Sequence, residues 1–322
     1  MAKEVSMDSQ LPAKVSRRKG AALRKWLIDA LSNWQLYVLL LPALIYVGIF
    51  SYGPMYGVQI AFRRYRADLG IWGSPWVGLE HFRRFIDFPN FWLIMTNTAR
   101  LGFYSLATFP IAIVFALLIN EIKNKFFKKT VQMVTYAPFF LSVVVVCAMT
   151  ILFLSRDNGI INNIRALVGL ERVEYMLSAS AFPHIFVWTG VWQFTGWGTI
   201  IYLAALSNVS VDLVEAARID GATRLGIIRH VNIPSIFPTV VIMLILSSGQ
   251  VLAVGFEKVF LLQTSLNLSR SQVIATYVYE VGLLGGQFSY SSAIGLFSTI
   301  INVSMLVLVN FIAKKVSDIS IW

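Results

Sequence analysis

Six stretches of the chain are long and almost free of charged residues. They lie at approximately 35–57, 99–120, 133–154, 184–206, 235–257 and 290–313. The fourth and fifth each contain 22 consecutive uncharged residues, at 185–206 and 235–256. A helix needs about 20 mostly apolar residues to cross about 30 Å of hydrocarbon, and lipid offers an open strand no hydrogen-bond partners. The pattern predicts an all-α membrane protein with six transmembrane helices.

The segment before the first span has a different pattern. In residues 21–33, apolar side chains recur on one helical face while the charged residues fall elsewhere on the wheel. The apolar members are Leu23, Trp26, Leu27, Ala30 and Leu31. This predicts an amphipathic helix on the inner membrane surface. Residues 1–20 are polar and predict a disordered cytoplasmic tail, so that a single transmembrane domain occupies 34–322.

Composition supports a membrane location and bears on the partners. The chain of 322 residues is 57% hydrophobic and 13% charged, and its mean hydropathy is +0.69. Soluble domains average about 45–50% apolar and about 25% charged residues. The net charge of +11 sits on Lys and Arg residues close to the apolar spans. It therefore predicts contact with anionic membrane lipid rather than with nucleic acid.

The distribution of Lys and Arg predicts the orientation. If both termini are cytoplasmic, the inside segments hold sixteen of these residues and the outside loops hold nine. Membrane proteins carry an excess of positive charge on the cytoplasmic side, so this orientation is favoured. Five arginines in the outer loop at 58–98 run against the rule: Arg63, Arg64, Arg66, Arg83 and Arg84. They are candidates for binding an anionic substrate at the outer mouth, or are solvated loop charges.

A compact charged segment separates the fourth and fifth spans. Ser210 can cap a helix that begins at Val211, and Gly221 allows the chain to turn. Thr223 can start a second short helix, and Pro234 ends it or leads into the fifth span. These signals predict two short helices, joined by a tight turn, that lie along the membrane. The segment either anchors to lipid or docks a protein partner.

The spacing within this segment resembles the EAA signature of the membrane subunits of ABC importers. That signature is E-A-A-x3-G-x9-I-x-L-P, with Val231 and Ile233 as conservative replacements of its last two aliphatic positions. The other matching residues are Glu215, Ala216, Ala217, Gly221 and Pro234, and Asp220 and Ala222 complete the D-G-A form typical of carbohydrate permeases. Residues 77–98 and 256–295 are also similar to sugar permeases, although His81 replaces a usual Asn and the common G-G-P is absent.

The resemblance implies a type I ABC importer permease fold with a cytoplasmic coupling loop at 207–234. Glu215 would pair with a basic residue of an ATPase, Gly221 would permit the turn, and the three alanines would pack in a groove of that subunit. The implied partners are a second, homologous permease subunit, two ATP-binding subunits and an extracytoplasmic solute-binding protein. The implied activity is import of a carbohydrate across the bacterial inner membrane by alternating access. The similarity extends to the oligosaccharide and polysaccharide branch, which includes importers of acidic alginate.

The chain lacks the motifs that would make it an enzyme. It contains no G-x-x-x-x-G-K-[ST] phosphate-binding loop, so ATP and Mg²⁺ are expected on the partner ATPase subunits and no cofactor on this chain. The three histidines lack metal-ligand spacing, which predicts no metal site. Cys147, the single cysteine, lies in an apolar run and is interpreted as a small core residue.

The fourth span contains the strongest candidates for a substrate path. In the sequence VWTGVWQFTGW, aromatic rings could stack on sugar faces and an amide could bind hydroxyl groups. The candidates here and in later spans are Trp188, Trp192, Gln193, Trp197, Gln250, Glu257 and Asn302. Alternatively, the tryptophans anchor the span at the interface, the glycines Gly190, Gly196 and Gly198 pack helices, and the polar groups stabilise the bundle.

Three other functions stay open at this point. The permease could carry a neutral oligosaccharide or another small solute. A channel or secondary transporter that works without ATP would need ion-coupling carboxylates deep in the spans. The one candidate, Glu257, lies near the end of the fifth span. A membrane anchor would recruit a partner through the charged segment without moving a solute.

Overall fold

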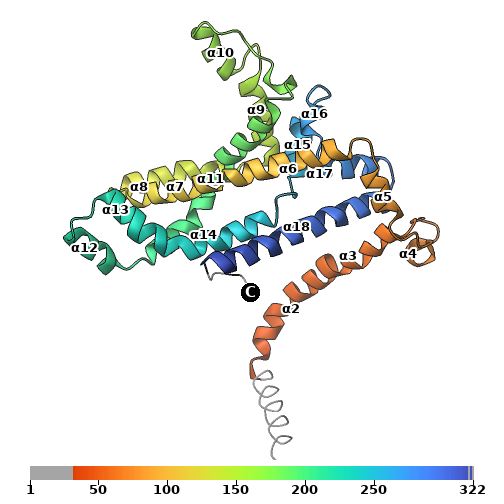
Figure 1. Ribbon diagram of the computed structural model, residues 1–322, viewed down its shortest axis with the longest axis horizontal. Coiled ribbons are helices and arrows are strands. Elements are labelled where there is room, and N and C mark those ends of the chain that lie inside the picture. Colours follow the sequence, from red (N-terminus) through yellow and green to blue (C-terminus); the bar gives the residue numbers. More distant parts are fainter. Residues whose placement is uncertain (1–31, 318–319, 321–322) are drawn as a thin grey trace, which may run out of the picture. The chain divides into compact units, whose positions relative to one another are not determined.

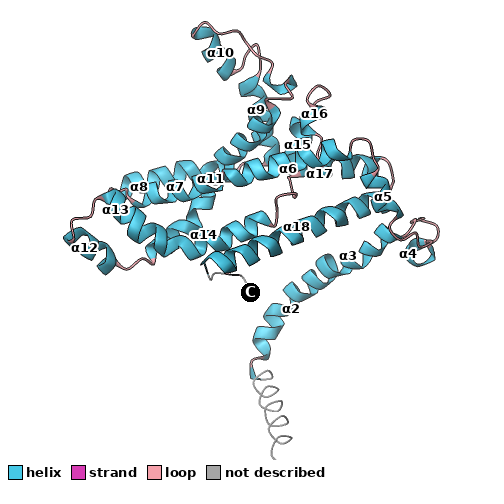
Figure 2. Ribbon diagram, viewed as in Figure 1, coloured by secondary structure: helices cyan, strands magenta, loops and turns pink. Residues whose placement is uncertain are grey.

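The computed structural model describes residues 32–317 and 320. The predictions for the tail at 1–20 and for an amphipathic helix at 21–33 therefore lie outside the described residues, apart from the last two positions of the helix. Within the described part the chain is helical, as Figure 2 shows, and strand pairing is confined to two isolated bridges, Arg63 with Trp76 and Arg66 with Gly70. The prediction of an all-α fold is confirmed.

The chain divides into two compact units, Met1–Gln59 and Ile60–Trp322. The described part of the first unit carries most of the first apolar span, Trp34–Phe62. Its elements are α2 (Trp34–Val47), a π-helical turn (Gly48–Tyr52), α3 (Gly53–Met55) and the start of a 3-10 helix (Tyr56–Phe62) that continues into the second unit. The widened turn falls just before Pro54, which has no N–H to donate to the helix.

The second unit holds the remaining apolar helices. Its long helices are α6 (Phe91–Ala107), α7 (Phe109–Asn120), α8 (Lys125–Tyr136), α9 (Val143–Leu154), α11 (Phe182–Ser207), α14 (Ile233–Ser248) and α18 (Phe288–Ser317). The shorter ones are α4 (Gly70–Gly73), α5 (Glu80–Ile86), α10 (Ile160–Leu167), α12 (Val211–Ile219), α13 (Arg224–Ile227), α15 (Phe256–Leu262), α16 (Leu268–Ser271) and α17 (Ile274–Val278) (Figure 1). Among the described residues four helices are long and apolar enough to cross a membrane, or six if each bent pair is one span.

The third predicted span is broken. A 3-10 turn, Ala137–Phe140, ends α8, and the chain turns by 100° before α9 begins at Val143. Ser142 caps α9 by accepting a hydrogen bond from the Val145 N–H at 3.3 Å. Pro138 lies inside the turn, where it cannot continue a hydrogen-bonded helix. The continuous helix expected over 133–154 is therefore two helices in different directions.

The fifth span differs most from its prediction. Its helix begins at Arg224 and passes through a π-helical turn, Ile228–Asn232, into α14, forming one apolar element, Arg224–Ser248. The second short helix was expected to lie along the membrane, but it is continuous with this span. The expectation of helix is also wrong over 249–255, because the chain is non-helical from Gly249 to Gly255. The segment is uncharged like the helix before it, and only Gly249 and Gly255 indicated in the sequence that the helix is interrupted.

Loops that are distant in sequence lie together in two groups. A cavity of about 330 Å³ is lined by residues 120–123 together with Arg218 and Arg224, so these two loops lie together. At other loops, the Asn267 side chain donates to the Met176 carbonyl at 3.0 Å, and Asn97 donates to the carbonyls of Ser269 and Gln272. Figure 1 shows α12 and α13 at one end of α7 and α14, well away from α16.

The core of the second unit is organised around α11. One buried cluster contains Phe182, Phe186 and Val187 of α11 with Val259 of α15, and another contains Tyr202 and Leu206 of α11 with residues of α7 and α14. Cys147 is buried in the first cluster, consistent with its interpretation as a core residue. Because α11 contributes to both clusters, the start of α11 packs against α15 and its end packs against α7 and α14.

Candidate functional site

The charged segment folds as its capping residues dictate. The Ser210 hydroxyl accepts the Asp212 N–H at 3.2 Å and begins α12. Gly221 has a φ of +80°, a left-handed conformation that glycine adopts without strain. The Thr223 hydroxyl accepts the Gly226 N–H at 3.2 Å and begins α13. The helix, the turn and the second helix start are therefore confirmed.

This segment leaves apolar and charged side chains uncovered together. Ile219 is 86% exposed, Leu225 74% and Leu213 55%. Glu215 and Asp220 are also exposed, as are Ala216 and Ala222, while Ala217 is half-buried. We call the surface of residues 211–225 the coupling surface. Exposed apolar groups rimmed by charges are typical of a protein–protein contact.

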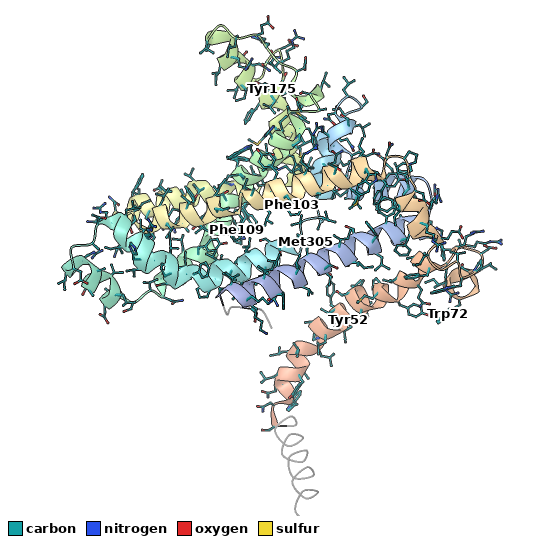
Figure 3. The ribbon with its side chains drawn as sticks, viewed as in Figure 1. Tyr52, Trp72, Phe103, Phe109, Tyr175 and Met305 are labelled. Atoms are coloured by element: carbon teal, nitrogen blue, oxygen red, sulfur yellow. The ribbon has the colours of Figure 1, made fainter. Side chains whose placement is uncertain are left out.

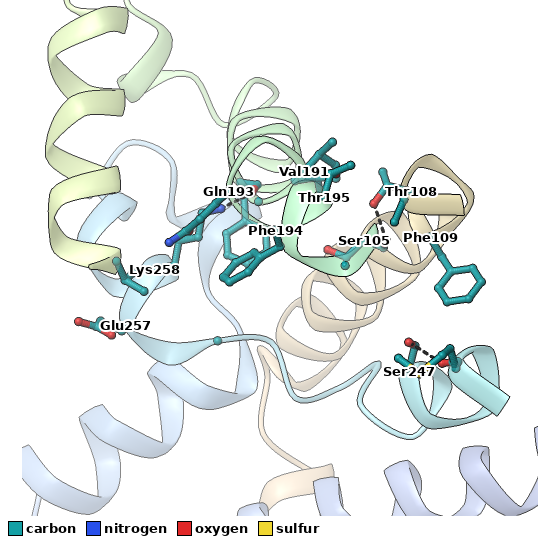
Figure 4. Close-up of a pocket in the computed structure, with 18 of the residues that line it drawn as sticks. Ser105, Thr108, Phe109, Val191, Gln193, Phe194, Thr195, Ser247, Glu257 and Lys258 are labelled. Atoms are coloured by element: carbon teal, nitrogen blue, oxygen red, sulfur yellow. Dashed lines mark hydrogen bonds between the residues drawn. The ribbon is translucent and has the colours of Figure 1, made fainter. Parts of the chain in front are cut away.

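A cavity of about 590 Å³ lies beside α11, enclosed by α6, α7, α14 and the start of α15. Aromatic rings and hydroxyl or amide groups share its wall, as the close-up in Figure 4 shows. The rings are Phe109, Phe186, Phe194, Tyr202 and Phe256, and the polar groups are Ser105, Thr108, Gln193, Thr195 and Ser247. Flat apolar faces with a few polar groups suit a sugar ring, which has apolar faces and hydroxyl edges. We call this space the α11 cavity.

Gln193, a predicted path residue, lines the α11 cavity and is 2% exposed. Its amide nitrogen donates to the Leu141 carbonyl at 3.0 Å. Leu141 lies in the break between α8 and α9, so its carbonyl has left the helical ladder and needs a donor. Gln193 Oε1 has no hydrogen-bond partner within the described chain. The amide thus supports the broken span and leaves an acceptor unused.

The predicted tryptophans do not line the α11 cavity with Gln193. Trp188 and Trp192 line a different cavity of about 690 Å³, together with His184 and residues of α9. The Trp188 indole donates to the Tyr104 hydroxyl at 3.0 Å. Trp197 stacks on Phe139, with ring centroids 4.1 Å apart. The structure therefore does not bring the three tryptophans and Gln193 into one site, and the role of the tryptophans in a substrate path stays a prediction.

The remaining predicted path residues lie around the non-helical segment 249–255. Gln250 lines a cavity of about 330 Å³ that shares Ser105, Thr108 and Ser247 with the α11 cavity. Glu257 lines the α11 cavity itself. Asn302 of α18 accepts the Leu252 N–H at 2.9 Å. Since the segment has no helical ladder of its own, Asn302 satisfies a backbone donor that lipid would leave unpaired.

Four of the five outer arginines contact other groups of the chain, three of them within their own loop. Arg64 pairs with Glu80 at 2.7 Å and Arg66 with Asp68 at 2.7 Å. Arg63 donates to the carbonyls of Trp72 and Ser74, and Trp72, labelled in Figure 3, is 72% exposed. The Arg84 guanidinium lies 4.2 Å from the Tyr290 ring centroid. These contacts favour the interpretation of loop charges over that of a substrate mouth.

One feature of the α11 cavity could not be predicted from the sequence. Its aromatic rings come from three separate elements, α7, α11 and α15, and no spacing rule connects Phe109 with Phe256. Lys258, next to the predicted path residue Glu257, also lines it. Glycines could have indicated the close packing here, because a methyl group on Gly102 would overlap the Val251 carbonyl oxygen.

The apolar spans, the lined cavity and the exposed coupling surface define a membrane-embedded subunit of a transporter. The chain belongs to the family of binding-protein-dependent transport system inner membrane components, whose profile matches residues 88–318. It is therefore a multi-pass inner-membrane protein of the ABC permease class. The predicted family and fold are confirmed.

Two curated relatives cover nearly the whole chain. The polygalacturonan/rhamnogalacturonan transport system permease protein YteP of Bacillus subtilis (strain 168) is 41% identical over 300 residues, which are 93% of this chain and 94% of that protein. The protein LplB of the same organism is 39% identical over 291 residues, which are 90% of this chain and 92% of that protein.

Two solved structures have the same fold. One, described as a bacterial ABC transporter involved in the import of the acidic polysaccharide alginate, matches with a TM-score of 0.83 and 34% identity, over 91% of this chain and 99% of that one. The other, a bacterial alginate ABC transporter in complex with an alginate pentasaccharide-bound periplasmic protein, matches with a TM-score of 0.83 and 33% identity, over 91% and 98%.

Proposed function

We propose that this chain is the permease subunit of an importer that moves an acidic oligosaccharide or polysaccharide through the α11 cavity by alternating access. The observation that carries the proposal is the coupling surface, where Ile219 and Leu225 are among the most exposed large apolar side chains of the second unit. Such groups need a soluble partner. Relatives that carry polygalacturonan and alginate support an acidic substrate.

In this proposal the partners are a second permease subunit, two ATP-binding subunits that hold ATP and Mg²⁺, and an extracytoplasmic solute-binding protein. The structural neighbour in complex with a periplasmic protein supports the last of these. Glu215 pairs with a basic residue of an ATP-binding subunit, while Ala216, Ala217 and Ala222 pack in its groove. The termini and the coupling surface face the cytoplasm, which the excess of Lys and Arg on that side supports.

The test of substrate class is ATP hydrolysis by the reconstituted importer with its binding protein. A panel of oligosaccharides is compared at equal concentrations: alginate and galacturonate oligomers as acidic sugars, and neutral oligomers of the same lengths. We expect stimulation by the acidic members. Stimulation by neutral sugars alone would contradict the proposed substrate, while assembly with no stimulation by any sugar would contradict carbohydrate import.

The test of coupling uses two glycines in the same segment. Gly221→Val forces a β-branched residue into a left-handed conformation, at a cost of about 1–3 kcal/mol, and we expect uptake to be lost while basal ATP hydrolysis persists. Gly226→Ala is the control, because its added Cβ would lie 3.4 Å from the nearest atom, the Thr223 hydroxyl oxygen, without a positive φ. Wild-type uptake by an assembled Gly221→Val importer would show that the turn does not transmit the ATPase cycle.

A further inference from the structure

Lys258 is a buried cation that lines the α11 cavity and forms no ion pair among the described residues. It belongs to α15 and is 8% exposed. Its neighbours Val259 and Leu262 lie in the apolar cluster with Phe182 and Phe186. The described residues form three ion pairs, and all three lie elsewhere. A charge taken out of water without a counter-ion costs free energy, so its retention at this position calls for an explanation.

The surroundings of the amine occupy only part of its hydrogen-bonding capacity. Lys258 Nζ donates to the Phe186 carbonyl at 2.7 Å and lies 4.9 Å from the centre of the Phe186 ring. An ammonium group has three N–H donors, and no further acceptor of Lys258 is found within the described chain. Cys147 is a nearby polar group, but it is a buried thiol in the apolar cluster. Two N–H donors therefore remain for a ligand.

A glycine of α11 leaves space for the Lys258 amine beside the helix. Position 190 of α11 is a glycine, and a Cβ there would lie 3.3 Å from Lys258 Nζ. Gly190, Gln193 and Lys258 all line the α11 cavity, and Figure 4 shows Gln193 and Lys258 on the same side of it. A lysine, a glutamine amide and aromatic rings together can bind a sugar ring and a carboxylate at once.

We propose that Lys258 is the specificity-determining residue of the α11 cavity, where its amine binds the carboxylate of a uronic-acid unit of the passing saccharide. This inference rests on the proposed function, and it names the residue that recognises the acidic group of the saccharide. Glu257 supplies the opposite charge at the cavity wall, where it is exposed. A carboxylate ligand is attracted by Lys258 and repelled by Glu257, so changes at the two adjacent residues affect uptake in opposite directions.

The experiment measures ATP-driven uptake of a radiolabelled galacturonate or alginate trimer into proteoliposomes that contain the complete importer. The variants are Lys258→Gln, Lys258→Arg and Glu257→Gln. We expect Lys258→Gln to lower maximal uptake about tenfold or more, because a hydrogen bond to a charged group is lost. Lys258→Arg keeps the charge and retains most uptake, and Glu257→Gln equals or exceeds the wild type. Assembly, basal ATP hydrolysis and the concentration of loaded binding protein for half-maximal stimulation stay unchanged.

Several outcomes overturn the inference. Uptake by assembled Lys258→Gln within twofold of the wild type shows that the amine does not bind the substrate. Equal losses in Lys258→Gln and Lys258→Arg, or a loss in Glu257→Gln, indicate packing rather than charge. If the Lys258→Gln importer fails to assemble, uptake by Glu257→Gln tests the inference instead, and a loss of uptake in that variant contradicts it. A wild-type importer that takes up neutral trimers but no acidic trimer contradicts the proposed function itself, which is a result distinct from any of these.

Discussion

The two faces of α11 differ in what they present. One face carries Gly190 and Gln193 into a cavity that also contains hydroxyl groups and charged residues. The other carries Trp188 and Trp192 into a cavity whose wall is almost wholly apolar. The aromatic residues that drew attention in the sequence lie on the second face, and the inconspicuous glycine and amide lie on the first. A substrate with many hydroxyl groups needs polar partners when it leaves water, so the less conspicuous face is the better candidate for the path.

The largest effect is expected where α11 is held in place. A side chain on Gly196 would overlap the Thr135 carbonyl oxygen of α8, so Gly196→Val should displace the helix and disturb both faces at a cost of about 3 kcal/mol. The thermal unfolding midpoint and the yield of assembled importer measure this. Gly198→Ala is the control, since its Cβ would meet Ala112 at an ordinary 3.5 Å. A wild-type midpoint for Gly196→Val would show that α8 and α11 can separate freely.

A smaller effect is expected on the cavity face. Gln193→Met keeps much of the side-chain volume but leaves the Leu141 carbonyl without its donor, which should destabilise the protein by about 1–3 kcal/mol. We also expect uptake to fall, because the amide leaves the cavity wall. Unfolding midpoint and uptake are measured on the same preparation. Unchanged uptake by a destabilised protein would assign Gln193 a purely structural role.

The smallest effect is expected on the tryptophan face. Trp188→Phe removes the hydrogen bond to Tyr104, which should cost about 1 kcal/mol of stability and leave uptake within twofold of the wild type. Trp192→Leu should leave uptake unchanged as well. The same uptake assay checks both. A tenfold loss of uptake in an assembled Trp192→Leu importer would instead support the sequence-based prediction of an aromatic substrate path, and the comparison of the two faces would fail.

The parts of the fold that follow local rules were predictable. Ser210, Gly221 and Thr223 act on their immediate neighbours, so their positions predicted both ends of α12 and the start of α13. The break at Leu141 and the non-helical segment after Gly249 were not predicted, because hydropathy does not distinguish a helix from backbone stabilised by distant side chains. Gln193 and Asn302 supply those partners from 52 and 50 residues away in sequence. The family resemblance indicated the transporter class, but only the folded chain brings Lys258 beside Gly190.

The unbroken helix from Arg224 to Ser248 connects the coupling surface with the α11 cavity. At about 1.5 Å per residue it is about 37 Å long, and Ser247 near its far end lines the cavity. A tilt of the whole helix at Leu225 would displace Ser247 sideways. The π-helical turn at Ile228–Asn232 and Pro238 inside α14 interrupt the regular hydrogen bonding of this helix, so they are the points at which it would bend.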